Sequence, residues 1–176
     1  DNHLGDWGTQ FGKLVYAYRQ WGDKKKIAGN SIKELNELYV KFHEEAEKNP
    51  EIEDKAREIF KKMEEGDKKL LNLWAKFKKI SIAEFKKVYE RLGIKFDTYL
   101  GESYFAGETD KIVEECLEKK LAKKDSETRA IVVENLDGLP SFLLRKKDDS
   151  GLYITRDLAA LIFRTEVFEP DDILYV

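Results

Sequence analysis

The 176-residue chain has little cysteine, proline or histidine, and these shortages exclude several classes of protein. A single Cys cannot form an internal disulfide, so disulfide-stapled secreted folds are excluded and the reducing cytoplasm is the expected location. The chain has only 3 Pro, and 41% of its residues are hydrophobic. Both features argue against a disordered chain. No apolar run approaches the roughly 20 residues that span a bilayer, so we expect no membrane partner.

The chain also lacks a large excess of charge of either sign. It carries 35 acidic and 32 basic residues, for a net charge of −3, so no basic field predicts nucleic-acid binding and any RNA contact must be local. Its charged residues are mainly Lys and Glu, while Gln10 and Gln20 are its only glutamines. This composition is typical of hyperthermophile proteins and predicts a thermophilic source.

Motifs for metals and phosphates are missing as well. His3 and His43 are far apart, and Cys116 lies alone on an apolar helical face, so we expect no metal site. The phosphate-binding pattern GxxxxGK[ST] does not occur. The sequence therefore identifies no catalytic residue by pattern.

Helical periodicity dominates the first 93 residues. Ser31 is a suitable N-cap, Pro50 suits both the end of one helix and the start of the next, and Ser81 with Glu84 forms a capping-box pattern. Gly93 is suited to end the last of these helices. The expected helices are 9–20, 31–48, 50–65, 70–77 and 81–92.

After Ile94 the pattern changes from helical periodicity to alternation, which favours strands. We expect an antiparallel pair from "RAIVVEN" and "PSFLLRK" around an "LDG" turn, a second turn at 148–151, and a helix that Thr155 caps. A helix is also expected over the apolar positions from Ile112 to Leu121. Other expected strands are 1–3, 94–100, 152–154 and 171–176, and the two ends of the chain suit a parallel sheet.

The first candidate for chemistry is the glycine-rich segment from Gly5 to Gly12. Glycines at a turn that opens a helix permit a phosphate group to approach the backbone, and helix N-termini suit anions. The spacing does not match GxGxxG, and a structural turn anchored by Trp7 explains the same residues. Both interpretations remain open.

The other candidates are carboxylates at two distant junctions. Glu102 follows the expected strand 94–100 and is either a binding residue or an ordinary loop residue. Asp157 would lie in the first turn of the helix after Thr155, where the helix dipole alone explains an acidic residue. Yet Tyr153 and Asp157 occupy a strand-to-helix junction, where open α/β sheets bind ligands. A phenol beside a fixed carboxylate suits a planar cation such as guanidinium.

Three segments, "NHLGDWGTQFG", "YERLGIKFDTYLGES" and "LYITRDLAAL", resemble the catalytic region of arginyl-tRNA synthetases in this order and at these separations. The helical stretch "KAREIFKKMEEGDKKLLNLWAKF" is similar too, so the resemblance covers essentially the whole chain. It implies a class I aminoacyl-tRNA synthetase. We therefore expect an α/β fold with a partial Rossmann-type parallel sheet in residues 1–29 and 94–176 and a large helical insertion in residues 30–93.

The resemblance also implies the chemistry. The parent enzyme would activate arginine with ATP, with Mg²⁺ as the counter-ion of ATP, and would esterify tRNA(Arg), as a monomer. Glu102 and Asp157 would accept hydrogen bonds from the guanidinium of arginine, Tyr153 would line the pocket, and Gln10 would lie at its edge. Two carboxylates around one guanidinium would also select against lysine.

The family's ATP-binding signatures, a "His-Ile-Gly-His"-like segment and a "Lys-Met-Ser-Lys-Ser"-like loop, are not in this chain. We therefore expect a partial chain that is inactive alone, because class I activation depends on groups that position ATP. Two other functions remain open. One is a non-catalytic RNA- or protein-binding module derived from such an enzyme, and the other is an unrelated small-molecule pocket shaped by Glu102 and Asp157.

Overall fold

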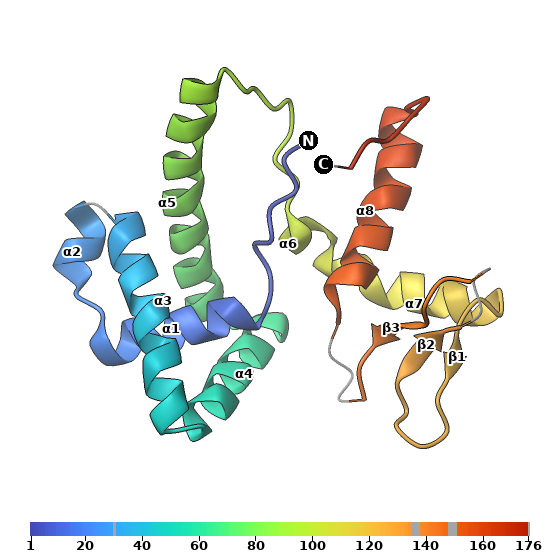
Figure 1. The fold of residues 1–176 in the computed structure, drawn as a ribbon, viewed down its shortest axis with the longest axis horizontal. Helices are drawn as coiled ribbons and strands as arrows, with labels where there is room; N and C mark the ends of the chain where they lie inside the picture. The colour runs from blue at the N-terminus through green and yellow to red at the C-terminus, as the bar shows by residue number, and fades with distance from the viewer. Residues whose placement is uncertain (30, 135–137, 148–150, 176) are drawn as a thin grey trace. The chain divides into compact units, whose positions relative to one another are not determined.

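The computed structural model describes residues 1–29, 31–134, 138–147 and 151–175. The chain forms two compact units (Figure 1). The helical unit comprises Asp1 and Asp6–Thr98, and the mixed unit comprises Asn2–Gly5 and Tyr99–Val176. None of the helices in the described ranges is long and apolar enough to cross a membrane.

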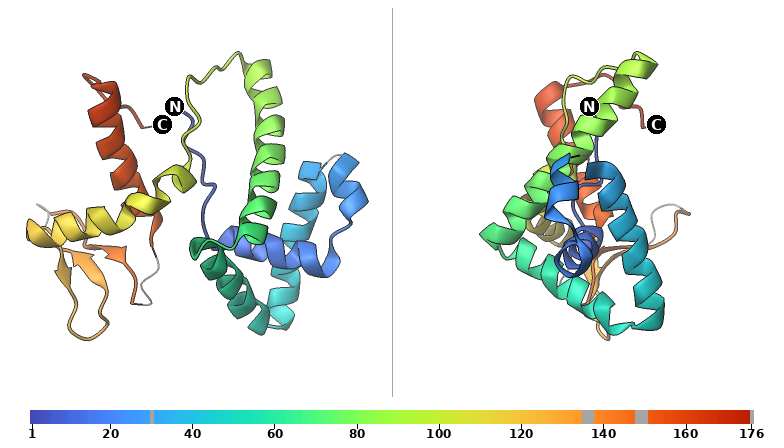
Figure 2. Two further views of the ribbon diagram at one scale, coloured as in Figure 1. Left: turned by 180° about the vertical axis from the view of Figure 1, so that it is seen from behind. Right: turned by 90° about the vertical axis from the view of Figure 1, so that its left-hand side faces the viewer.

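The helical unit follows the periodicity of the sequence closely. α1 packs against α3 and α4, and Figure 2 shows these helices from two further sides. Pro50 directly precedes one helix, and Gly93 ends another in the left-handed region at φ 69°, as predicted. The helices are α1 (Thr9–Trp21), α2 (Lys24–Gly29), α3 (Ser31–Lys48), α4 (Glu51–Glu64) and α5 (Lys68–Leu92).

Gly12 allows the backbones of α1 and α4 to approach closely. A Cβ built on Gly12 would lie 2.1 Å from the carbonyl oxygen of Ala56, a separation that no side chain tolerates. Val15 on α1 and Phe42 on α3 are fully buried in the surrounding core. The glycine in this part of the "GDWGTQFG" motif therefore serves helix packing.

The predicted break at Ser81 is wrong, because α5 is one continuous helix of 25 residues. Its cap is Asp67, whose carboxylate accepts hydrogen bonds from the amides of Lys69 at 2.9 Å and Leu70 at 3.0 Å. Neither Gly nor Pro occurs between Lys68 and Leu92 to interrupt it. Ser81 lies in the helix interior, where no unpaired amide needs a cap.

The mixed unit combines helices with a small sheet. The order β1-β2-β3 is antiparallel throughout, which confirms the predicted antiparallel pair. The turn expected between that pair falls mainly on residues 135–137, and the turn expected at 148–151 falls mainly on 148–150, both outside the described residues. The elements are α6 (Glu102–Phe105), the 3₁₀ helix η1 (Ala106–Glu108), α7 (Thr109–Glu118), β1 (Lys123–Lys124), β2 (Ile131–Val133), β3 (Phe142–Arg145) and α8 (Tyr153–Phe168).

The start of α8 differs from the prediction. The helix begins at Tyr153 with Leu152 at the N-cap, so a strand over 152–154 is wrong and Asp157 is not in the first turn. Thr155 is fully buried, and its hydroxyl donates to the carbonyl oxygen of Leu144 instead of capping the helix. This contact joins α8 to β3.

The predicted parallel sheet is not confirmed. In the described part of the chain, residues 1–3, 94–100 and 171–175 form no strand. A backbone hydrogen bond, from the amide of Glu102 to the carbonyl oxygen of Leu4 at 2.9 Å, joins the N-terminal segment to the start of α6. A parallel strand needs neighbours on both sides, and no strand among the described residues supplies them. The coarser expectation of a mixed helix-and-strand protein holds.

Candidate functional site

Glu102 and Arg156 form an ion pair in the mixed unit. The Nε and Nη2 atoms of Arg156 each lie 2.7 Å from Oε2 of Glu102. The side chains are only 7% exposed for Arg156 and 15% for Glu102. Glu102 is the first residue of α6, and a Cβ on Gly5 would lie 3.6 Å from its Oε1. The pair therefore joins α8 to α6 at a position close to the N-terminal segment.

Tyr153 and Asp157 lie four residues apart on α8, so they share one face of that helix. Tyr153 is 63% exposed. Asp157 is 41% exposed, and one of its oxygens, Oδ1, lies 3.2 Å from Nε2 of His3. The other ring nitrogen of His3 lies 2.9 Å from the carbonyl oxygen of Leu100. A phenol and a carboxylate are thus both accessible to solvent on this face.

The structure brings three of the four predicted site residues to one corner of the mixed unit. Glu102 binds Arg156, which is the neighbour of Asp157 in the chain, and Tyr153 lies one helical turn before Asp157. Sequence reasoning missed Arg156 and His3. The position of Arg156 inside the "YITRD" motif is a usable signal for its role, whereas no local pattern links His3 to Asp157, 154 positions away.

Gln10 belongs to the helical unit. It is exposed on α1, where its Oε1 accepts a hydrogen bond from the hydroxyl of Thr9 at 3.0 Å. The preceding turn is anchored, because the Trp7 ring packs edge-on against Trp74 with ring centroids 5.3 Å apart. The indole N–H of Trp74 in turn donates to the carbonyl oxygen of Asp6 at 2.7 Å. This bears out the structural interpretation of Trp7.

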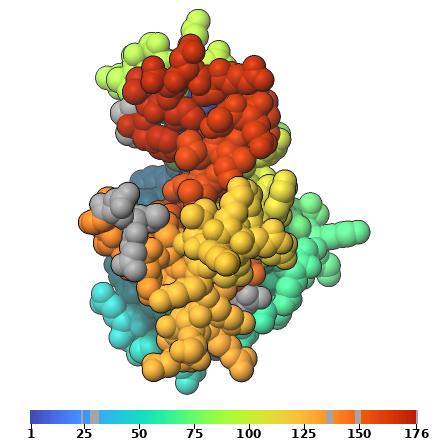
Figure 3. Space-filling view, turned by 90° about the vertical axis from the view of Figure 1, so that its right-hand side faces the viewer, coloured from blue at the N-terminus to red at the C-terminus, as the bar shows by residue number. Residues whose placement is uncertain are grey.

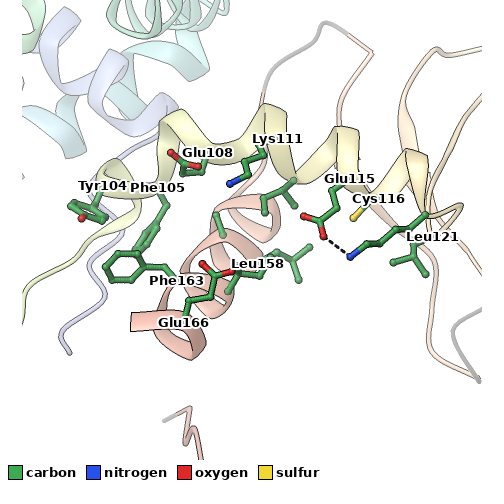
Figure 4. Close-up of a pocket in the computed structure, with 14 residues that line it drawn as sticks. Tyr104, Phe105, Glu108, Lys111, Glu115, Cys116, Leu121, Leu158, Phe163 and Glu166 are labelled. Atoms are coloured by element: carbon green, nitrogen blue, oxygen red, sulfur yellow. Dashed lines mark hydrogen bonds and ion pairs between the residues drawn. The ribbon is translucent and has the colours of Figure 1, made fainter. Parts of the chain in front are cut away.

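A separate groove of about 740 Å³ lies between α7 and α8 in the mixed unit. Figure 3 shows the surfaces of these helices next to each other, and Figure 4 shows the lining side chains. Two of the lining residues, Lys119 and Glu115, form an ion pair. Burial, with a smaller contribution from Glu115, raises the pKa of the Cys116 thiol above its ordinary value. None of the four predicted site residues lines this groove.

Comparisons with known proteins agree with the resemblance in the sequence. The family described as tRNA synthetases class I (R), catalytic domain, matches residues 1–176. An arginine–tRNA ligase of Clostridium acetobutylicum is 45% identical over 175 residues, which is 99% of this chain and 31% of that protein. An arginine–tRNA ligase of Alkaliphilus metalliredigens is 47% identical over the same shares of the two chains.

The fold agrees as well. The crystal structure of arginyl-tRNA synthetase from Plasmodium falciparum superposes with a TM-score of 0.74 at 28% identity, over 93% of this chain and 27% of that one. The chain spans 31% of the length of the curated relatives given above. Because the family match extends over all 176 residues, the chain belongs to the class I tRNA synthetases (R), catalytic domain family.

Proposed function

We propose that this chain is the part of an arginine–tRNA ligase that holds the side chain of the substrate arginine. The observation that carries the proposal is the corner formed by α6 and α8. There Glu102 pairs with Arg156, and Asp157 is the next residue along α8. Carboxylates so placed suit a guanidinium, whose planar donors match carboxylate oxygens.

Each residue would have a distinct role. Asp157 would accept hydrogen bonds from the guanidinium, and the ring of Tyr153 would line the pocket one helical turn away. Glu102 already gives Oε2 to Arg156, so it would offer the substrate Oε1. Gln10 keeps the role that the family resemblance implies, at the edge of the site.

The whole protein would activate arginine in two steps. The carboxylate of arginine would attack the α-phosphorus of ATP and release pyrophosphate, and a terminal ribose hydroxyl of tRNA(Arg) would then attack the arginyl-adenylate and release AMP. The residues of this chain would fix the position of the substrate, which lowers the entropic part of the barrier. In the described ranges no group of three acidic, His or Cys residues could hold a metal ion, so Mg²⁺ would accompany ATP.

The proposal includes the fold of the parent protein. Segments 1–3, 94–100 and 171–176 would become strands of a Rossmann-type parallel sheet when neighbouring strands are supplied by the rest of a longer chain. Residues 1–29 and 94–176 would then belong to the catalytic domain, and residues 30–93 to a helical insertion. We place this protein in the cytoplasm as a monomer.

ATP–pyrophosphate exchange tests the function directly. A longer protein that carries these residues should exchange pyrophosphate when arginine is present and far less when lysine replaces it, whereas the isolated 176 residues should give only background. Absence of arginine-dependent exchange in the longer protein, with tRNA added, would favour the alternative, a non-catalytic RNA- or protein-binding module.

A further inference from the structure

Basic residues are concentrated on one helix of the helical unit. α5 carries seven Lys and one Arg against two Glu, which gives it a charge of +6 in a chain whose net charge is −3. In α3 and α4, by contrast, acidic residues outnumber basic ones. A net charge of −3 requires any RNA contact to be local, and α5 is a local source of positive charge.

Six of the seven lysines of α5 are exposed, and they form two adjacent rows along the helix. Their spacings within each row are close to two and three full helical turns, and each row extends over about 28 Å at 1.5 Å per residue. The buried side chains of Leu70 and Phe77 lie on the side of α5 opposite the first row. We call these two rows the lysine face of α5. The first row is Lys68, Lys79 and Lys86, and the second is Lys69, Lys76 and Lys87.

The lysine face is not explained by helix stability. Lys68, Lys76 and Lys79 form no ion pair with any residue that the structure describes. Like charges one turn apart, such as Lys76 and Lys79, destabilise a helix. The helix dipole also disfavours Lys68, which is the first residue of α5. Because these positions are exposed, packing does not require lysine there either.

An open hollow of about 530 Å³ lies along the same helix. Lys79 and Lys86 of the lysine face line it, together with Ala75 and Ala83. The two alanines have small side chains, so the backbone of a partner can approach the helix closely between the lysines. α5 therefore offers both positive charge and room for an extended anionic chain.

We propose that the lysine face of α5 binds the phosphate backbone of RNA. Lysine ammonium groups are flexible point charges that bind phosphates, and such contacts position a nucleic acid without reading its sequence. A helix that binds a membrane surface inserts its apolar face into the bilayer, whereas Leu70 and Phe77 of α5 are buried in the core of their own unit. The identification of this RNA as tRNA(Arg) rests on the function proposed above.

The salt dependence of tRNA binding gives the first readout. The Kd of the longer protein for tRNA(Arg) is measured by fluorescence anisotropy between about 0.05 and 0.5 M KCl. The combined variant Lys68→Gln, Lys76→Gln and Lys79→Gln should bind at least about tenfold more weakly at ~0.1 M salt. The slope of log Kd against log salt concentration should fall by about 2 to 3, because each lost phosphate contact removes roughly 0.7–0.9 from it.

Three lysines of α4 supply the matched control. Lys55, Lys61 and Lys62 are exposed in the same unit, and their combined replacement by Gln changes the net charge by the same amount. This variant should keep the Kd within about twofold and the slope unchanged. Replacement of the three α5 lysines by Arg retains the charge and should retain binding. Equal weakening by the α4 and α5 Gln variants would overturn the lysine face, since binding would then follow net charge alone.

An acidic polypeptide is the other polyanion to compare. Polyglutamate should displace tRNA(Arg) only weakly at equal charge concentration, because a nucleic-acid duplex carries more charge per unit length and releases more counterions. Displacement as strong as that by unlabelled tRNA would overturn RNA as the partner and assign the lysine face to an acidic protein.

Activity measurements separate this inference from the proposed function. In the α5 Gln variant of the longer protein, the KM for tRNA(Arg) in aminoacylation should rise about tenfold while the KM for arginine stays unchanged. Unchanged tRNA binding by this variant, with arginine-dependent exchange intact, would overturn the lysine face and leave the proposed function standing. Weakened RNA binding by this variant, in a protein without arginine-dependent exchange, would support the lysine face and remove the proposed function.

Discussion

Arg156 on α8 directs two of its nitrogens, Nε and Nη2, at the same oxygen of Glu102 on α6. Because both side chains are largely buried, removal of the carboxylate takes a close counter-charge away from a guanidinium that is largely shielded from water. Glu102→Leu should therefore destabilise the mixed unit by about 3 kcal/mol, and addition of Arg156→Leu should recover most of that loss. Urea unfolding of the single and double variants measures both values.

An exposed pair on the same unit supplies the control. Glu115 on α7 pairs with Lys119, the exposed residue that follows the end of this helix, so Glu115→Gln should leave the unfolding midpoint nearly unchanged. If Glu102→Leu changed the unfolding midpoint as little as Glu115→Gln, the ion pair between α6 and α8 would not contribute to stability.

Gly12→Ala should destabilise the helical unit, because its Cβ would meet the carbonyl oxygen of Ala56 on α4. Overpacking of this kind typically costs about 1–3 kcal/mol, and here the obstacle is backbone that cannot rotate away. Thermal unfolding measures the loss. Gly107→Ala is the matched substitution, since its Cβ would have no neighbour within 4 Å. Equal effects of the two substitutions would exclude a close α1–α4 approach.

Asp67, the N-cap of α5, should make the free energy of unfolding of the helical unit depend on pH in the acid range. The backbone amides of Leu70 and Lys69, the former more strongly, lower the pKa of Asp67 below its ordinary value. The contribution of this carboxylate is therefore complete above the unfolded-state pKa of about 4 and is lost as the pH falls through the lower folded-state pKa. Asp67→Asn keeps an acceptor that does not titrate, so its acid unfolding curve should be shallower below pH ~4.

Asp67→Ala completes this comparison. Alanine provides neither the charge nor the acceptor, so this variant should be less stable than Asp67→Asn at neutral pH. Circular dichroism during an acid titration records both curves. Indistinguishable curves for the unmodified chain and Asp67→Asn would show that Asp67 does not contribute to the acid dependence.

Cys116 should react slowly with alkylating reagents. Burial raises the pKa of its thiol, so a smaller fraction is thiolate at pH 8 than in an unstructured peptide. Its alkylation rate by iodoacetamide should be below that of glutathione at pH 8 and should still increase above pH 9. Because the chain has 1 Cys, the reaction reports this thiol alone. A rate equal to that of glutathione would contradict the burial of Cys116.

Much of the helical unit could be predicted from the sequence, because its helix ends are local features. Pro50 and Gly93 mark ends that the structure confirms. The continuous α5 could not be read correctly, since the pattern at Ser81 and Glu84 is equally compatible with a helix interior. Segments 1–3 and 94–100 have strand-like patterns, but strand formation depends on neighbouring strands that a local pattern does not reveal.

The candidate site was predictable only in part. Glu102, Tyr153 and Asp157 follow from the resemblance to a family, and the structure places them in one unit. The pairing of Glu102 with Arg156 joins residues 54 positions apart, and His3 contacts Asp157 across 154 positions. No spacing rule along the chain reveals contacts of that separation.

The most direct test of the account is the arginine KM of the longer protein carrying Asp157→Asn, measured by ATP–pyrophosphate exchange. Loss of a charge-assisted hydrogen bond worth about 1.5–3 kcal/mol should raise that KM by roughly 10- to 150-fold. Asp54→Asn, an exposed residue of α4 paired with Arg57, should leave it unchanged. An arginine KM that stays the same in Asp157→Asn would contradict the assignment of this corner as the arginine pocket.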